Sequence, residues 1–343
     1  MYYIPQDEKK QYDYVTYPRQ FVTYSWYKPL LTMILTLVFA LALMVLTAFA
    51  GSILGKIELG VDYQEFLNTF KGGYDNMDLS TITGAVINLG PTVALLPALM
   101  LARAIVRDRT WSSYSSSRGG WDPGLFIKCL LIALLVVAAP IYARRVYYSG
   151  FQKPSAFSGS VLAVVIVLSI LQCITEEYVF RGLLLQTLGS WFRIPIIAIV
   201  LAALPFALLH PYNNLGKGLI LITGLAFGIT AWVCRGLEAS AALHIGNNLI
   251  VFALQSIGLP EMGSDVEMSD FIFFAIIYSV YTIIMIILSK TTQWFEKVRK
   301  NDAEIFNGKI NAKRSAKAQK RARTSGRSSG SRSGSYQGKH FKH

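Results

Sequence analysis

The sequence is dominated by apolar stretches that are each long enough to cross a membrane as a helix. Such a helix needs about 20 mainly apolar residues to span a hydrocarbon core of about 30 Å. We find eight stretches, at residues 29–54, 82–106, 124–143, 159–188, 194–212, 217–234, 237–257 and 269–290. Their apolar residues are continuous rather than alternating, which indicates helices and not the strands of a barrel. The sequence therefore predicts an all-α polytopic membrane protein with about eight transmembrane helices.

The composition supports this fold class. Of the 343 residues, 53% are hydrophobic and 15% are charged, whereas about 25% of the residues in a soluble domain are charged. The first stretch is long for a secretory signal and has no A-x-A-like cleavage site, so we expect it to stay in the mature protein.

The stretches divide the chain into five parts. These are a cytoplasmic N-terminal segment at 1–28, three helices with an external acidic loop (55–81) at 29–158, helices four to seven at 159–257, an external loop and the eighth helix at 258–290, and a basic tail at 291–343.

The basic tail carries most of the formal net charge of +13. Residues 291–343 contain fourteen Lys and Arg against three acids, a difference of +11. The part from about 308 is rich in Ser, Gly, Lys and Arg and has few apolar residues to bury, which predicts disorder. Cationic segments next to a membrane are retained on the cytoplasmic side and attract anionic lipid. We expect anionic lipid as the partner of the tail, and no specific nucleic acid.

The loop charges predict the orientation. With eight spans and a cytoplasmic tail, both termini are cytoplasmic, and the acidic loops at 55–81 and 258–270 are external, as expected if Lys and Arg stay inside. One loop conflicts with this orientation, because Arg144, Arg145 and Lys153 would lie outside. The loop charges and the lack of an N-terminal targeting extension favour a multi-pass protein of a bacterial plasma membrane.

A few polar residues lie inside the apolar stretches. A charge at the centre of a bilayer costs at least about 2.5 to 3.5 kcal/mol, so such residues usually have a role. The fourth stretch contains Glu176, Glu177 and Arg181, the fifth ends at His210, and the seventh contains His244 and Asn248. Arg181 follows Glu177 by four residues, so the two can form an ion pair on one helix face, while Glu176 points elsewhere. The sixth stretch contains GLAFG, whose Gly224 and Gly228 suit close helix packing.

These groups together could hydrolyse a peptide bond. Glu176 could take a proton from water. His210 and His244 could orient that water, or bind a metal ion together with the carboxylate, and Asn248 could stabilise an oxyanion. The alternatives are a structural ion pair with polar side chains that join helices, and a proton or ion carrier.

The three groups also resemble a known family. EEYVFRG matches an EExxxR motif, FALLH an FxxxH motif and HIGNN an HxxxN motif, in the order found in the CPBP family of intramembrane endopeptidases. This family, also called the CAAX-protease and bacteriocin-processing or Abi family, includes the eukaryotic CAAX prenyl endopeptidase. The resemblance covers about residues 159–257 and implies a catalytic core in helices four to seven.

The resemblance implies a role for each matching residue. Glu176 would be the general base, Glu177 and Arg181 would support it, His210 and His244 would complete the water site, and Asn248 would donate to the oxyanion. Phe206 would pack beside His210. We favour a mechanism without a metal. If a metal such as zinc is bound, its ligands would be Glu176, His210 and His244.

The sequence thus predicts an intramembrane endopeptidase that hydrolyses a membrane-associated peptide or protein. Access from the cytoplasm is suggested by resemblance to the prenyl endopeptidase. The alternative is a non-enzymatic scaffold of the same fold that binds a sensor or a cell-envelope protein.

Overall fold

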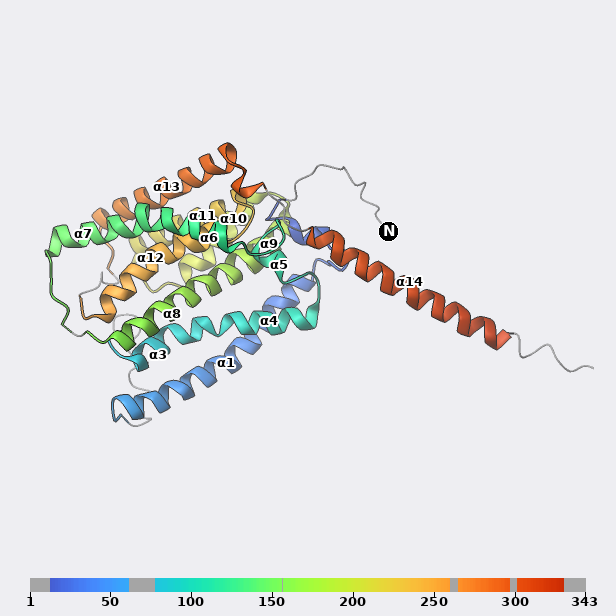
Figure 1. Cartoon of the computed structure of the whole chain (residues 1–343), viewed down its shortest axis with the longest axis horizontal. Coiled ribbons are helices and arrows are strands. Elements are labelled where there is room, and N and C mark those ends of the chain that lie inside the picture. The colour runs from blue at the N-terminus through green and yellow to red at the C-terminus, as the bar shows by residue number, and fades with distance from the viewer. Residues whose placement is uncertain (1–12, 62–77, 156, 260–264, 297–300, 330–343) are drawn as a thin grey trace, which may run out of the picture.

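The computed structural model describes residues 13–61, 78–155, 157–259, 265–296 and 301–329, and these are almost entirely helical (Figure 1). They contain no β-strand, and their single β-bridge joins Ser116 to Gly236. The all-α prediction is confirmed.

The first half of the chain forms η1 (Tyr17–Gln20), α1 (Lys28–Glu58), α3 (Ile82–Val93), α4 (Leu95–Val106), α5 (Ser112–Ser115), α6 (Pro123–Ala133), η3 (Leu134–Ala138) and α7 (Ala139–Ser149). The second half forms α8 (Gly159–Glu177), η4 (Tyr178–Leu185), α9 (Gln186–Phe192), α10 (Pro195–Leu208), α11 (Asn214–Val233), α12 (Glu238–Ser256), α13 (Met268–Thr291), η5 (Gln293–Phe295) and α14 (Asp302–Ser329).

Six helical segments of the described residues are long and apolar enough to cross a membrane. They are Lys28–Glu58, Ile82–Val106, Pro123–Ser149, Gly159–Phe192, Asn214–Val233 and Met268–Thr291. The two other predicted spans are present as helices that are not among the six. The first, α10, has only 14 residues, and the second, α12, includes Glu238, His244 and two asparagines.

The long helices lie side by side, and α12 is at the centre of the bundle (Figure 1). It packs against α6, α8, α11 and α13. Every residue of α12 from Glu238 to Gly246 is buried. A polar side chain on this part of α12 therefore faces other helices and not lipid.

Small residues allow the close packing of α10 against α11. A Cβ atom added to Gly224 would lie 3.0 Å from the Cβ of Ala203, and one added to Gly228 would lie 2.8 Å from Cγ2 of Ile199. The predicted role of these glycines in packing is confirmed.

The prediction of a disordered tail is wrong for residues 302–329, which form α14. Asn301 accepts the backbone N–H of Glu304 at 3.2 Å, which caps the helix. Phe306 packs with Tyr17 and Phe21 of the N-terminal segment. The side chain of Asn307 donates to Gln20 O at 2.8 Å. Ala, Lys, Arg and Gln also have high helix propensity, which the composition rule for disorder does not consider.

One of the three conflicting cations, Arg144 of α7, is paired. Arg144 donates to Asp270 of α13 at 2.6 Å, and its guanidinium lies between the rings of Tyr148 and Phe273, 4.8 and 4.9 Å from their centroids. A charge that is neutralised in the fold gives little information on topology. The predicted external loops extend over residues 62–77 and 260–264, which lie outside the described residues.

We expect Gly228→Ala to lower stability relative to Gly218→Ala on the same helix. A methyl group at 218 meets Phe271 at an ordinary 3.5 Å, whereas at 228 it must displace Ile199. Both changes gain helix propensity, so their difference isolates the packing cost, which we expect to be about 1–3 kcal/mol. Denaturant unfolding of the purified proteins in detergent measures this difference. Equal stabilities would contradict the packing role.

Candidate functional site

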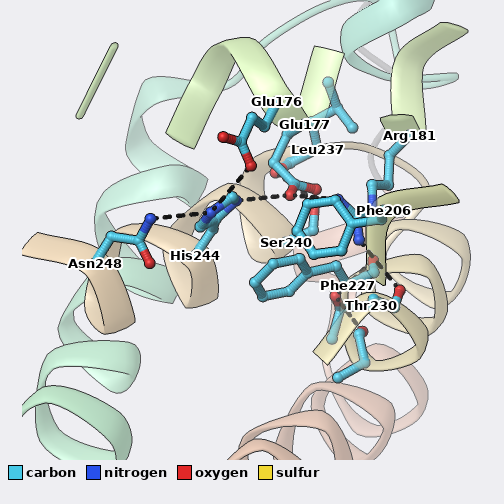
Figure 2. A network of polar contacts seen from close by, with 12 residues as sticks. Glu176, Glu177, Arg181, Phe206, Phe227, Thr230, Leu237, Ser240, His244 and Asn248 are labelled. Carbon is cyan, nitrogen blue, oxygen red and sulfur yellow. Dashed lines mark hydrogen bonds and ion pairs between the residues drawn. The ribbon is translucent and has the colours of Figure 1, made fainter. Parts of the chain in front are cut away.

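The candidate site lies where α8 meets α12. Glu176 and Glu177 are the last two residues of α8, and the wider π-helical segment η4 begins at Tyr178. Such π-helical turns often occur at functional sites. His244 projects from α12 towards both glutamates (Figure 2). Glu176 is 8% exposed, Glu177 0% and His244 3%, so the group lies inside the protein.

The imidazole of His244 lies between the two carboxylates. Its Nδ1 is 3.0 Å from Oε1 of Glu177, and its Nε2 is 3.7 Å from Oε2 of Glu176. The ring of Phe227 stacks on the imidazole at a centroid distance of 4.7 Å. A carboxylate at Nδ1 requires an N–H there, so Glu177 determines which nitrogen of His244 carries the proton in the neutral ring.

The predicted ion pair between Glu177 and Arg181 is present. Nη1 of Arg181 lies 3.1 Å from Oε1 of Glu177, and Nη2 donates to the carbonyl of Gly224 in α11 at 3.3 Å. The guanidinium also lies 4.4 and 4.8 Å from the ring centroids of Phe206 and Phe227. Arg181 therefore neutralises Glu177 in an apolar environment and joins the α8 segment to α11.

A chain of side-chain hydrogen bonds orients Asn248. Tyr278 of α13 donates to Oδ1 of Asn247 at 2.6 Å, and Asn247 donates to Oδ1 of Asn248 at 2.8 Å. The amide nitrogen of Asn248 then faces Nε2 of His244 at 3.3 Å. The side-chain oxygen of Asn248 already accepts a hydrogen bond from Asn247. The amide nitrogen of Asn248 is therefore directed at Nε2 of His244, the same nitrogen that Glu176 faces.

The second glutamate has a different environment. Glu176 accepts a hydrogen bond from Gln172, one turn earlier on α8, at 2.9 Å, and no ion pair with Arg181 is recorded among the described residues. As expected, Glu177 and not Glu176 pairs with Arg181, but both carboxylates face the imidazole of His244 rather than pointing to separate places.

His210 does not join this network directly. Its Nδ1 lies 2.7 Å from the carbonyl of Phe206, and its ring lies 4.9 Å from the Phe206 ring, as the resemblance implied. It lines a cavity of about 130 Å³ together with Gln172, His244 and Asn248. The structure thus brings Glu176, Glu177, Arg181, His244 and Asn248 into one network and places His210 across a shared cavity.

The proposed ligand set for a metal does not assemble. The described residues contain no group of three His, Cys, Asp or Glu side chains arranged to hold a metal ion. The carboxylate of Glu177 at Nδ1 of His244 and the carbonyl of Phe206 at Nδ1 of His210 hold the two rings in place. In this structure Glu176, His210 and His244 do not form a three-ligand site, and the choice between a metal-free and a metal-dependent mechanism stays a prediction.

Sequence reasoning missed three members of the site, Gln172, Asn247 and Tyr278. The first two could have been found, because they are polar residues inside predicted spans. Gln172 comes one helical turn before Glu176, and Asn247 is next to Asn248. Tyr278 gave no signal, because a tyrosine in an apolar helix is common and its partner is 31 residues away in sequence.

Residues 158–250 match the family model described as type II CAAX prenyl endopeptidase Rce1-like. This match contains every residue of the three motifs and confirms the resemblance to the CPBP family. The segments 1–157 and 251–343 lie outside it. A comparison with curated proteins finds no match.

We expect Arg181→Met to destabilise the protein by about 3–5 kcal/mol, because the charge of Glu177 then loses its cationic partner in the protein interior. The control is Arg314→Met on the exposed part of α14, which should leave stability unchanged. The double variant Glu177→Gln/Arg181→Met should recover part of the loss, since it removes both charges. Thermal and denaturant unfolding in detergent measure these effects, and an Arg181→Met protein as stable as the control would contradict the ion-pair assignment.

Proposed function

We propose that this protein is an intramembrane endopeptidase that hydrolyses a peptide bond in a membrane-associated peptide or protein with water activated by Glu176. The match to the Rce1-like family supports a CAAX-type intramembrane protease in general. The observation that supports the mechanism is that His244 and Asn248 line a cavity, while Glu176 lies 3.7 Å from Nε2 of the same His244.

Glu176 is the general base. Its carboxylate is buried, lies near Nε2 of His244 and lacks the arginine partner that holds Glu177. It takes a proton from a water molecule as the oxygen of that water adds to the carbonyl carbon of the substrate. The protonated Glu176 then gives the proton to the leaving nitrogen, so that the peptide bond breaks and the carboxylate is restored.

The developing oxyanion accepts hydrogen bonds from the amide of Asn248. This amide has a second N–H beside the one that faces His244, and its orientation is held by Asn247 and Tyr278. A donor fixed before the reaction stabilises the transition state without reorganisation at that moment. His210, on the other side of the cavity, contributes to the water site.

Glu177 and Arg181 are positioning residues in this mechanism. The carboxylate of Glu177 holds Nδ1 of His244, and Arg181 holds the carboxylate. They keep the imidazole in the orientation that places Nε2 near Glu176 and Asn248.

The reaction proceeds without a metal in this proposal, and no step uses one. We further propose a bacterial plasma membrane with both termini in the cytoplasm. There the exposed lysines of α14, such as Lys309 and Lys313, contact anionic lipid.

We expect Glu176→Gln to reduce cleavage by about 10²- to 10⁴-fold, the usual contribution of general base catalysis, with unchanged expression and unfolding. Glu304→Gln, an exposed change on α14, is the matched control. The purified proteins are incubated with a proteome-derived peptide library in detergent, and new peptide termini are counted by mass spectrometry. Substrates are also sought among peptides that co-purify with the Glu176→Gln protein. Equal cleavage by the Glu176→Gln and Glu304→Gln proteins would refute the role of Glu176. If the wild-type protein cleaves no peptide and Glu176→Gln cells behave like wild-type cells, the scaffold function is favoured.

We expect the same cleavage to persist after treatment with 1,10-phenanthroline and EDTA, since the side chains do not form a three-ligand site. The initial rate before and after chelation, and after dialysis with added zinc, measures this. Loss of activity on chelation and its return with zinc would contradict the metal-free mechanism.

A further inference from the structure

One end of the bundle is filled by two segments that the proposed chemistry does not use. They are the N-terminal residues 13–22 and the loop 107–122, which lie at the end from which α14 extends (Figure 1). Tyr14, Arg109 and Tyr114 are 0% exposed, and Arg118 is 2% exposed. Burial raises the pKa of the Tyr114 phenol to about 12, which agrees with a dry interior at this end.

The loop 107–122 is bonded to the helices that carry the site. Arg109 donates to the carbonyl of Gly182 at 3.2 Å, and Ser115 shares a hydrogen bond of 2.5 Å with the hydroxyl of Tyr178. Both partners belong to the π-helical segment η4 that follows Glu177. A path from this end to Glu176 would have to pass through these packed groups.

The same loop closes over the start of α12. Arg118 and Glu238 form an ion pair of 2.7 Å in which the side chains are 2% and 1% exposed. The other carboxylate oxygen of Glu238 accepts the backbone N–H of Asp122 at 2.9 Å. The backbone N–H of Leu237 donates to Ser115 O at 2.8 Å. The approach to His244 along α12 is therefore closed on this side.

At the opposite end, the described residues leave cavities beside the site. With 14 residues, α10 is about 21 Å long, which is shorter than the hydrocarbon core, and the half-buried His210 just after it lines the cavity. The cavity beside His244 extends from here between the first half of α11 and the second half of α12. Its outer walls include Tyr212, Gly216 and Val266.

A second cavity lies next to the first. It has a volume of about 310 Å³ and shares Val251 and Phe274 with the first. Its outer part is lined by Arg144 and Asp270, at the ends of α7 and α13 farthest from α14. Apolar walls and a charged rim suit a peptide segment that lies partly in the membrane.

We propose that substrate and water reach Glu176 and His244 from the end of the bundle opposite α14. This inference rests on the proposed function. With the basic α14 on the cytoplasmic side, the opening faces the outside of the cell, so the substrates are exported membrane-associated proteins or peptides. This replaces the cytoplasmic access that the family resemblance suggested.

The test is the side from which introduced cysteines react with a membrane-impermeant maleimide. Three single changes are made in the full-length chain: Val251→Cys in the wall of both cavities, Ser315→Cys on α14, and Ile276→Cys on the face of α13 that is 56% exposed. The native cysteines are buried, so the unchanged chain supplies the background. In sealed vesicles with the outer face outward, Val251→Cys should react at least about tenfold faster than Ile276→Cys, because thiolate forms in water and not in lipid. Ser315→Cys should react only after detergent is added.

Each outcome is decisive. Reaction of Val251→Cys from the same side as Ser315→Cys, or from neither side, overturns the proposal. If the two cysteines react from opposite sides but Ser315→Cys reacts from the outside, the cavity still opens at the end opposite α14. In that case the opening faces the cytoplasm, and the claim that the substrates are exported is wrong. Labelling requires no turnover, and the double variant Glu176→Gln/Val251→Cys should be labelled like Val251→Cys. A failure of the proposed protease function is thereby separated from a failure of this inference.

Discussion

The neutralisation of Glu177 is the interaction on which the rest of the site depends. A carboxylate inside a membrane protein is costly unless it is paired and hydrogen-bonded. Glu177 meets both conditions, because Oε1 lies 3.1 Å from Arg181 and 3.0 Å from His244. Since Arg181 also bonds Gly224 of α11 and His244 comes from α12, one charge fixes the positions of three helices. The ion pair is therefore both a structural and a positioning element.

The same interaction separates the roles of two neighbouring glutamates. Glu177 uses its charge to hold Arg181 and His244. Within the described part of the chain, Glu176 accepts a hydrogen bond from Gln172 and lies near Nε2 of His244. Adjacent residues on a helix differ by about 100° in direction, so one sequence motif can supply a structural carboxylate and a reactive one. In the proposed mechanism, this division leaves Glu176 free to exchange a proton.

Local spacing was enough to predict what a single helix determines. The Glu177–Arg181 pair and the shared face of His244 and Asn248 follow from residues four apart. The meeting of α8 with α12 was inferred from the co-occurrence of a few polar groups inside the spans and from the motif resemblance, because no local pattern encodes contacts between distant helices. For the same reason the sequence did not reveal the Arg118–Glu238 pair, whose partners are 120 residues apart. The folded α14 was missed because the rule for disorder weighs charge and apolar content but not helix propensity or the packing of Phe306 on Tyr17 and Phe21.

The proposed water-using site within a membrane would also account for the short length of one predicted span, α10, and the polar residues of another, α12. Hydrolysis needs polar side chains and water at a depth where lipid supplies neither. In the proposed mechanism, the chain meets this need by ending α10 after 14 residues, so that His210 lies at a cavity, and by placing His244 and Asn248 on α12. Polar residues are tolerated on α12 because helices surround it, and Glu238 to Gly246 are all buried. In the proposed mechanism, the short length of α10 and the polar residues of α12 are consequences of carrying the site, which lies between these two helices and α8.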